Sequence, residues 1–293
     1  MAFTAPWEAI TLLLTDPWLR QAWLALAVAA LAAAPCGVLL VTRRMSLMGD
    51  AMSHAILPGV ATGYLLAGFS LPAITVGGLV AGVAVAWAAG WASRNTALFE
   101  DATLAGFQLS ALALGILLIT AQGNPTDVMH LLFGSVLALD RATLGFIVGT
   151  AAVTLLTLVV CRRAIAFEWF DSETLRRLDP RASARTYYLT LAVIVAMMVA
   201  VFQALGALLG LTLLMLPALT ARLWANRLLP TFVTAASIGA AGSTIGLCAA
   251  LAGDWPPGPA VAATLSLGYL VSLFFAPYGL WRRRHPSPKH RVA

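Results

Sequence analysis

The residues best suited to chemistry lie in one short apolar segment, where Asp50 and His54 are four residues apart. On a helix this spacing places a carboxylate and an imidazole on the same face. Because Pro58 has no N–H to donate, we expect the carbonyl of His54 to lack its helical partner. With the hydroxyl of Ser53, these atoms suit a divalent ion such as Zn²⁺, Mn²⁺ or Fe²⁺. The segment therefore predicts a partial metal site that a facing helix, a second subunit or water would complete.

The same residues also have a purely structural interpretation. Asp50 could cap the start of a helix, and His54 could bond a neighbouring helix. A second pair, Asp127 and His130, is three residues apart and could also bind metal. A capped helix at the membrane surface explains that pair equally well. Residue spacing alone leaves these alternatives open.

The chain around these residues is too apolar for a soluble protein. Of its 293 residues, 60% are hydrophobic and 10% are charged, whereas soluble domains carry about 25% charged residues. Apolar runs of about 17 to 24 residues recur, and each could cross a hydrocarbon core about 30 Å thick. We therefore predict an all-α polytopic membrane protein with about nine transmembrane helices, in a range of eight to ten, at residues 22–42, 49–68, 72–93, 102–121, 142–161, 187–203, 206–221, 229–251 and 259–280.

The predicted spans form a single membrane domain over residues 1–293. Residues 1–20 contain prolines and acidic residues and are expected to lie at the membrane surface. Residues 162–186 and 221–229 are predicted cytoplasmic connectors, and residues 281–293 a basic cytoplasmic tail.

Positive charge is concentrated on one side of the predicted spans. Of the 18 Lys and Arg residues, all except Arg20 and Arg141 fall on that side. The positive-inside rule places this side, with the C-terminus, in the cytoplasm, and we expect the inner membrane of a bacterium. Membrane orientation also accounts for the net charge of +6, so no nucleic-acid partner is predicted.

Several sequence signatures of enzymes are missing. The chain has no GxxxxGK[ST] phosphate-binding loop, and its one lysine, Lys289, lies in the tail. It therefore cannot hydrolyse ATP by the P-loop mechanism. It also lacks HExxH and GxSxG. We expect no catalytic residue and no permanently bound cofactor, and energy for any transport must come from elsewhere.

The residues from Arg44 to Gly59 resemble the most recognisable segment of a known family, the permeases of ATP-binding-cassette importers for manganese, zinc or iron. Further short segments resemble the same family in the same order, namely 100–101, 127–134, 170–173, 216–223 and 255–259. The resemblance extends over about residues 35–277. Its strength comes from the common order and spacing of these segments.

This resemblance implies a homodimeric permease that binds an ATPase subunit on the cytoplasmic side and receives metal from an extracytoplasmic solute-binding protein. It also implies that Asp50 and His54 lie on the metal route. The residues implicated in coupling to the ATPase are Arg222, Leu223, Trp224, Ala225, Asn226, Arg227 and Leu228.

We therefore expect an ATP-driven importer of a divalent transition metal that works by alternating access. Zinc and manganese both accept Asp and His ligands, and overall resemblance favours zinc. One alternative is a binding-cassette permease for a metal chelate such as cobalamin or a siderophore. The other is a proton-driven secondary metal carrier.

Overall fold

The computed structural model describes residues 11, 15–68, 70–97, 99–120 and 139–280. In this part of the chain the ordered elements are helices, and no strand occurs. The principal helices are α2 (Pro17–Thr42), α3 (Met48–Ala55), α4 (Leu57–Ala67), α5 (Leu71–Asn95), α6 (Glu100–Thr120), α8 (Arg141–Val160), α9 (Arg162–Phe170), α10 (Ser172–Leu178), α11 (Pro180–Leu205), α12 (Ala207–Trp224), α13 (Leu228–Gly253) and α14 (Pro257–Phe275).

Eight of these helices are long and apolar enough to cross a membrane. The remaining predicted span, residues 49–68, consists instead of two shorter helices, α3 and α4, that meet at Ile56. Pro58 lies in the first turn of α4, where its missing N–H does not cost a helical hydrogen bond. The prediction of an all-α polytopic membrane protein is confirmed, with one span interrupted.

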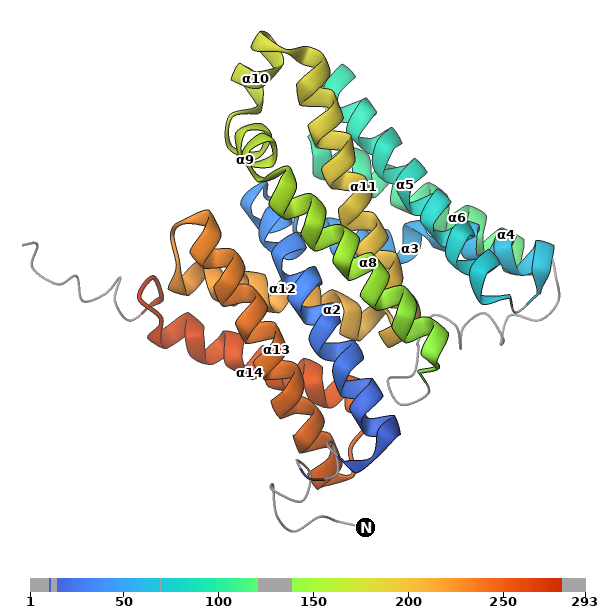
Figure 1. Cartoon of the computed structure of the whole chain (residues 1–293). Coiled ribbons are helices and arrows are strands. Elements are labelled where there is room, and N and C mark those ends of the chain that lie inside the picture. Colours follow the sequence, from blue (N-terminus) through green and yellow to red (C-terminus); the bar gives the residue numbers. More distant parts are fainter. Residues whose placement is uncertain (1–10, 12–14, 69, 98, 121–138, 281–293) are drawn as a thin grey trace, which may run out of the picture.

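The helices form two flanking groups around a central row (Figure 1). Helices α2, α8 and α11 lie in the middle, α4, α5 and α6 pack on one side, and α12, α13 and α14 pack on the other. Helix α2 is rich in alanine and is buried along much of its length, because α12 and α13 both pack against it.

Glycine permits the closest helix approach in the first flanking group. A side-chain methyl group at either Gly59 in α4 or Gly77 in α5 would overlap the backbone carbonyl of the other. Small residues at such positions let membrane helices pack backbone against backbone. Helix α4 is therefore held firmly on α5 although it is short.

Several helix boundaries differ from the predicted ones. Helix α2 begins at Pro17, where the Asp16 side chain accepts a hydrogen bond from the Trp18 N–H, so the end of the predicted surface segment is helical. The predicted connector 162–186 contains α9, α10 and the first turns of α11. The predicted tail 281–293 lies outside the described residues.

One end of the helix bundle carries most of the arginines. It contains the end of α2, the end of α5, the start of α6, and α9 and α10. The Trp23 indole N–H donates to the Thr244 hydroxyl, which places the second half of α13 beside the start of α2. The turn between α12 and α13 therefore lies at the same end as Arg43, and we call this the arginine-rich end.

Candidate functional site

Helix α3 presents Asp50 and His54 on one side. Asp50 is exposed and His54 is partly buried, while Met48 and Met52 on the opposite side are fully buried in the core. Leu47, just before the helix, is 64% exposed. The predicted shared face of the carboxylate and the imidazole is therefore present, and it is open in the single chain.

One of the other predicted ligand atoms on this segment, the Ser53 hydroxyl, is already engaged. The Ser53 hydroxyl is buried and donates to the backbone carbonyl of Asp50 at 2.7 Å. The Ile56 N–H donates to the Met52 carbonyl at 3.2 Å and also faces the His54 carbonyl. The hydrogen bond of the Ile56 N–H thus goes to Met52, and Pro58 supplies no N–H to the His54 carbonyl.

Asp50 and His54 do not by themselves make a metal site within one chain. Among the described residues, no group of three or more His, Cys, Asp or Glu side chains could hold a metal ion. The second predicted pair, Asp127 and His130, lies outside the part of the chain that the structure describes. Completing a coordination shell around Asp50 and His54 therefore requires water or groups from elsewhere.

The turn that leads into α3 is tightly held. Arg44 adopts a left-handed backbone conformation with φ of 62°, which is uncommon for a residue with a side chain. The Met45 N–H then donates to the Leu40 carbonyl at 2.9 Å, and the Met45 side chain is 4% exposed. The end of α2 and the start of α3 are thus joined by a short, fixed connection.

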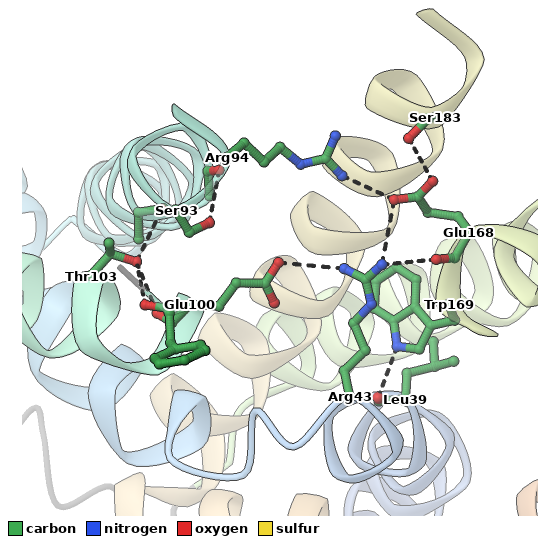
Figure 2. A network of polar contacts seen from close by, with 12 residues as sticks. Leu39, Arg43, Ser93, Arg94, Glu100, Thr103, Glu168, Trp169 and Ser183 are labelled. Carbon is green, nitrogen blue, oxygen red and sulfur yellow. Dashed lines mark hydrogen bonds and ion pairs between the residues drawn. The ribbon is translucent and has the colours of Figure 1, made fainter. Parts of the chain in front are cut away.

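The arginine-rich end contains an ion-pair network that the sequence did not predict (Figure 2). Its centre is Glu168 of α9, whose side chain is fully buried. The carboxylate accepts from Arg94 at 2.9 Å, from Arg43 at 3.4 Å and from the Ser183 hydroxyl at 2.7 Å. Arg43 also donates to the Glu168 backbone carbonyl at 2.8 Å and to Glu100 at 3.5 Å.

Aromatic residues complete the network. The Trp169 indole N–H donates to the Leu39 carbonyl at 2.8 Å. The guanidinium of Arg43 lies 4.6 Å from the centre of the Trp169 ring, and that of Arg94 lies 4.0 Å from the centre of the Tyr187 ring. Such cation–π contacts stabilise guanidinium groups that have lost water. Helices α2, α5, α6, α9 and α11 are thus joined at one end of the bundle.

The network borders a cationic pocket. Arg43, Arg44, Arg94 and Arg176 line this pocket, with Glu100 as the one acidic residue in its lining. A divalent cation would be repelled by this excess of positive charge. The lining of this pocket therefore does not suit a divalent cation.

The residues predicted to couple to an ATPase form a short turn at the arginine-rich end. Helix α12 ends at Trp224 and α13 begins at Leu228, with Asn226 and Arg227 exposed between them. The Tyr278 N–H donates to the Leu223 carbonyl at 3.1 Å, so the segment after α14 fastens one side of this turn. The turn is accessible from outside the bundle.

The fold and the α3 segment together define a multi-pass α-helical membrane protein with an ionisable face on an interrupted helix. Residues 15–276 match the model of a protein family that is described as the ABC 3 transport family. The chain therefore belongs to this family, and the family assignment inferred from the sequence is confirmed.

Individual relatives agree with this assignment. The chain is 31% identical over 266 residues to the manganese transport system membrane protein MntC of Halalkalibacterium halodurans, covering 90% of this chain and 89% of that protein. It is 31% identical over 268 residues to the manganese import system permease protein ScaB of Streptococcus gordonii, covering 91% and 94%. The solved structure of PsaBC from Streptococcus pneumoniae in complex with a Fab superimposes with a TM-score of 0.80 at 29% identity, covering 94% of this chain and 98% of that one.

Proposed function

We propose that this chain is the membrane-spanning permease subunit of an ATP-driven importer for a divalent metal ion, with Mn²⁺ as its cargo. The observation that carries the proposal is the exposed pair of Asp50 and His54 on α3, within an interrupted membrane helix. The relatives reported above are named for manganese transport or import. They support manganese over the zinc that overall resemblance favoured.

The exposed face of α3 supports a second permease copy beside it. An ionised carboxylate in contact with lipid costs a few kcal/mol, so the Asp50 side chain requires water or protein around it. A homodimer whose two α3 faces line a hydrated route would provide both. In that arrangement Asp50 and His54 from each copy bind the passing ion weakly enough to release it.

The arginine-rich end is the proposed cytoplasmic side, because positive charge marks the cytoplasmic ends of membrane helices. It exposes the Arg222–Leu228 turn and helix α10, in which Leu178 is 72% exposed; Phe170 at the end of α9 is 64% exposed. We place the ATPase subunit on these two connectors and the solute-binding protein at the opposite end.

This arrangement supplies energy from outside the chain. The sequence contains no phosphate-binding loop, so ATP binding and hydrolysis on the partner would switch the permease between outward-open and inward-open states. A ligand shifts such an equilibrium only through its different affinity for the two states. ATP would act through the ATPase dimer that bridges the two permease copies.

Uptake into proteoliposomes tests this function and separates its alternatives. The permease is reconstituted with its ATPase and solute-binding protein, and uptake of labelled Mn²⁺ and Zn²⁺ is followed with and without ATP. With each metal supplied alone, ATP-dependent accumulation of Mn²⁺ is the expected result.

Three other results contradict the proposal in different ways. Accumulation of Zn²⁺ with no Mn²⁺ uptake identifies zinc as the cargo. Uptake of a cobalamin or siderophore complex with no free-ion uptake identifies a chelate permease. Uptake by the permease alone, driven by a pH gradient, identifies a secondary carrier.

A further inference from the structure

The α9–α10 connector is joined rigidly to its neighbours along the chain. A single residue, Asp171, separates α9 from α10, and its side chain accepts from the Thr174 N–H. A single residue, Asp179, separates α10 from α11, and its side chain accepts from the N–H groups of Arg181 and Ala182. Exposed α10 therefore has no flexible loop on either side, and a displacement of α10 acts directly on α9.

Glu168 of α9 is bound across the bundle to the end of α2. Arg43 reaches both the side chain and the backbone carbonyl of Glu168, and the neighbouring Trp169 donates to Leu39. These contacts join residues 125 to 130 positions apart in the sequence. Helix α9 therefore has two independent attachments to the last turn of α2.

Electrostatics makes the Glu168 attachment stiff. The side chains of Arg43 and Arg94 are 11% and 14% exposed, and that of Glu168 is fully buried. With Glu100, the cluster holds two positive and two negative charges. Withdrawing Glu168 from Arg43 would leave buried charge without its partner, which is far more costly than moving both groups together.

Arg43 in turn controls the position of α3. Only four residues separate Arg43 from Met48, the first residue of α3. Within them, Arg44 has its left-handed backbone and Met45 is fixed by its hydrogen bond to Leu40. Since Met48 is fully buried, a shift of Arg43 displaces α3 and its exposed face instead of being absorbed in a loose loop.

We propose that Glu168 and Arg43 are positioning residues that transmit displacement of the α9–α10 connector to α3, and so to Asp50 and His54. This inference rests on the proposed function for its transport consequence. A buried ion pair is often no more stabilising than apolar residues of similar size. Its best-attested use is to select one conformation or register over another. The network at the arginine-rich end fits that use, because it links an exposed connector to the helix with the candidate metal ligands.

Hydrogen exchange on the full-length permease tests the link without any transport. Glu168→Gln keeps the shape of the side chain and removes its charge. We expect amide exchange in residues 43–55 to rise at least about fivefold, as for a coupling free energy of about 1 kcal/mol, while exchange in α13 and α14 is unchanged. Arg43→Lys keeps the charge but loses the forked geometry, so it should give a smaller rise in the same residues.

Asp140→Asn is the matched control. It changes an exposed carboxylate to an amide at the start of α8, and asparagine is still a good helix cap. Exchange in residues 43–55 should match that of the wild type. Two results for Glu168→Gln would overturn the proposal. Faster amide exchange confined to α9, α10 and α11 would mean a local structural role, and an equal rise in amide exchange in all helices would mean a general loss of stability.

The complex with the ATPase and the solute-binding protein gives the second readout. Glu168→Gln should keep ATP hydrolysis while the number of metal ions transported per ATP falls at least about fivefold. The proposal is overturned if the number of metal ions transported per ATP is unchanged, which includes the case in which ATP hydrolysis and metal uptake fall together. If the wild-type complex hydrolyses ATP and moves no metal, the proposed function fails, and the exchange experiment still decides whether Glu168 and α3 are linked.

Discussion

Gly115 of α6 should be among the least replaceable residues near the candidate site, because it packs against the junction of α3 and α4. A Cβ at this position would lie 2.8 Å from the Cβ of Leu57 and 3.1 Å from the nitrogen of Pro58. Carbon atoms in contact normally lie about 3.5 Å or more apart. Gly115→Ala must therefore move α6 and the junction apart by about 0.7 Å.

This overpacking should cost about 1 to 3 kcal/mol of unfolding free energy. Replacing glycine by alanine in a helix also gains up to about 1 kcal/mol, which would hide part of the cost. Gly106→Ala in the same helix is a matched control, because nothing lies within 4 Å of its added Cβ. The difference between the two variants then isolates the packing cost.

Thermal unfolding of the two variants in the same detergent measures this difference. We expect Gly115→Ala to unfold several degrees below Gly106→Ala, and to show weaker metal uptake in the reconstituted complex because the α3–α4 junction is displaced. An unfolding midpoint for Gly115→Ala equal to or above that of the control would refute the packing argument.

Three further outcomes are expected. Pro58→Ala supplies an N–H whose helical acceptor is the His54 carbonyl, so α3 and α4 should join into one straighter helix, which a slowly exchanging amide at position 58 would report. Metal uptake should fall because the face carrying Asp50 is reoriented. Trp169→Phe removes the hydrogen bond to Leu39 and should lower the unfolding free energy by about 1 kcal/mol, measured by denaturant titration; no change would mean that this bond contributes nothing net. Hydrogen bonds from Thr143 lower the pKa of the Asp140 carboxyl. The ionised carboxylate should therefore stabilise the fold above the ordinary Asp pKa, and this stabilisation should be lost as the pH falls through the lowered value. When thermal unfolding is followed against pH, the midpoint of Asp140→Ala should fall less on the acid side than that of the wild type.

The membrane class and the approximate positions of the spans could be predicted because apolar length is a local property of the sequence. Boundaries were less accurate where charged residues are helical. Helix α11 begins at Pro180, well before the apolar stretch predicted at 187, because Asp179 caps a turn that contains arginines. Hydropathy marks the apolar part of a helix and not its ends.

The shared face of Asp50 and His54 could also be predicted, because a spacing of four fixes neighbours within one helix. The ion-pair network could not. Glu168 lies 74 residues from Arg94 and 125 from Arg43, and only the packing of α5, α9 and the end of α2 brings them together. In the sequence, Glu168 is indistinguishable from a charge on a solvated connector.

The measurement that tests the central claim most directly is ATP-driven Mn²⁺ uptake by Asp50→Asn in the complete reconstituted complex. The substitution removes the charge of one candidate ligand and keeps the size of the side chain. We predict that the variant assembles with the ATPase and hydrolyses ATP, while Mn²⁺ uptake at limiting metal falls at least about tenfold and Asp140→Asn transports like the wild type. Normal uptake by Asp50→Asn would contradict the account, because the metal would then pass without the carboxylate on α3.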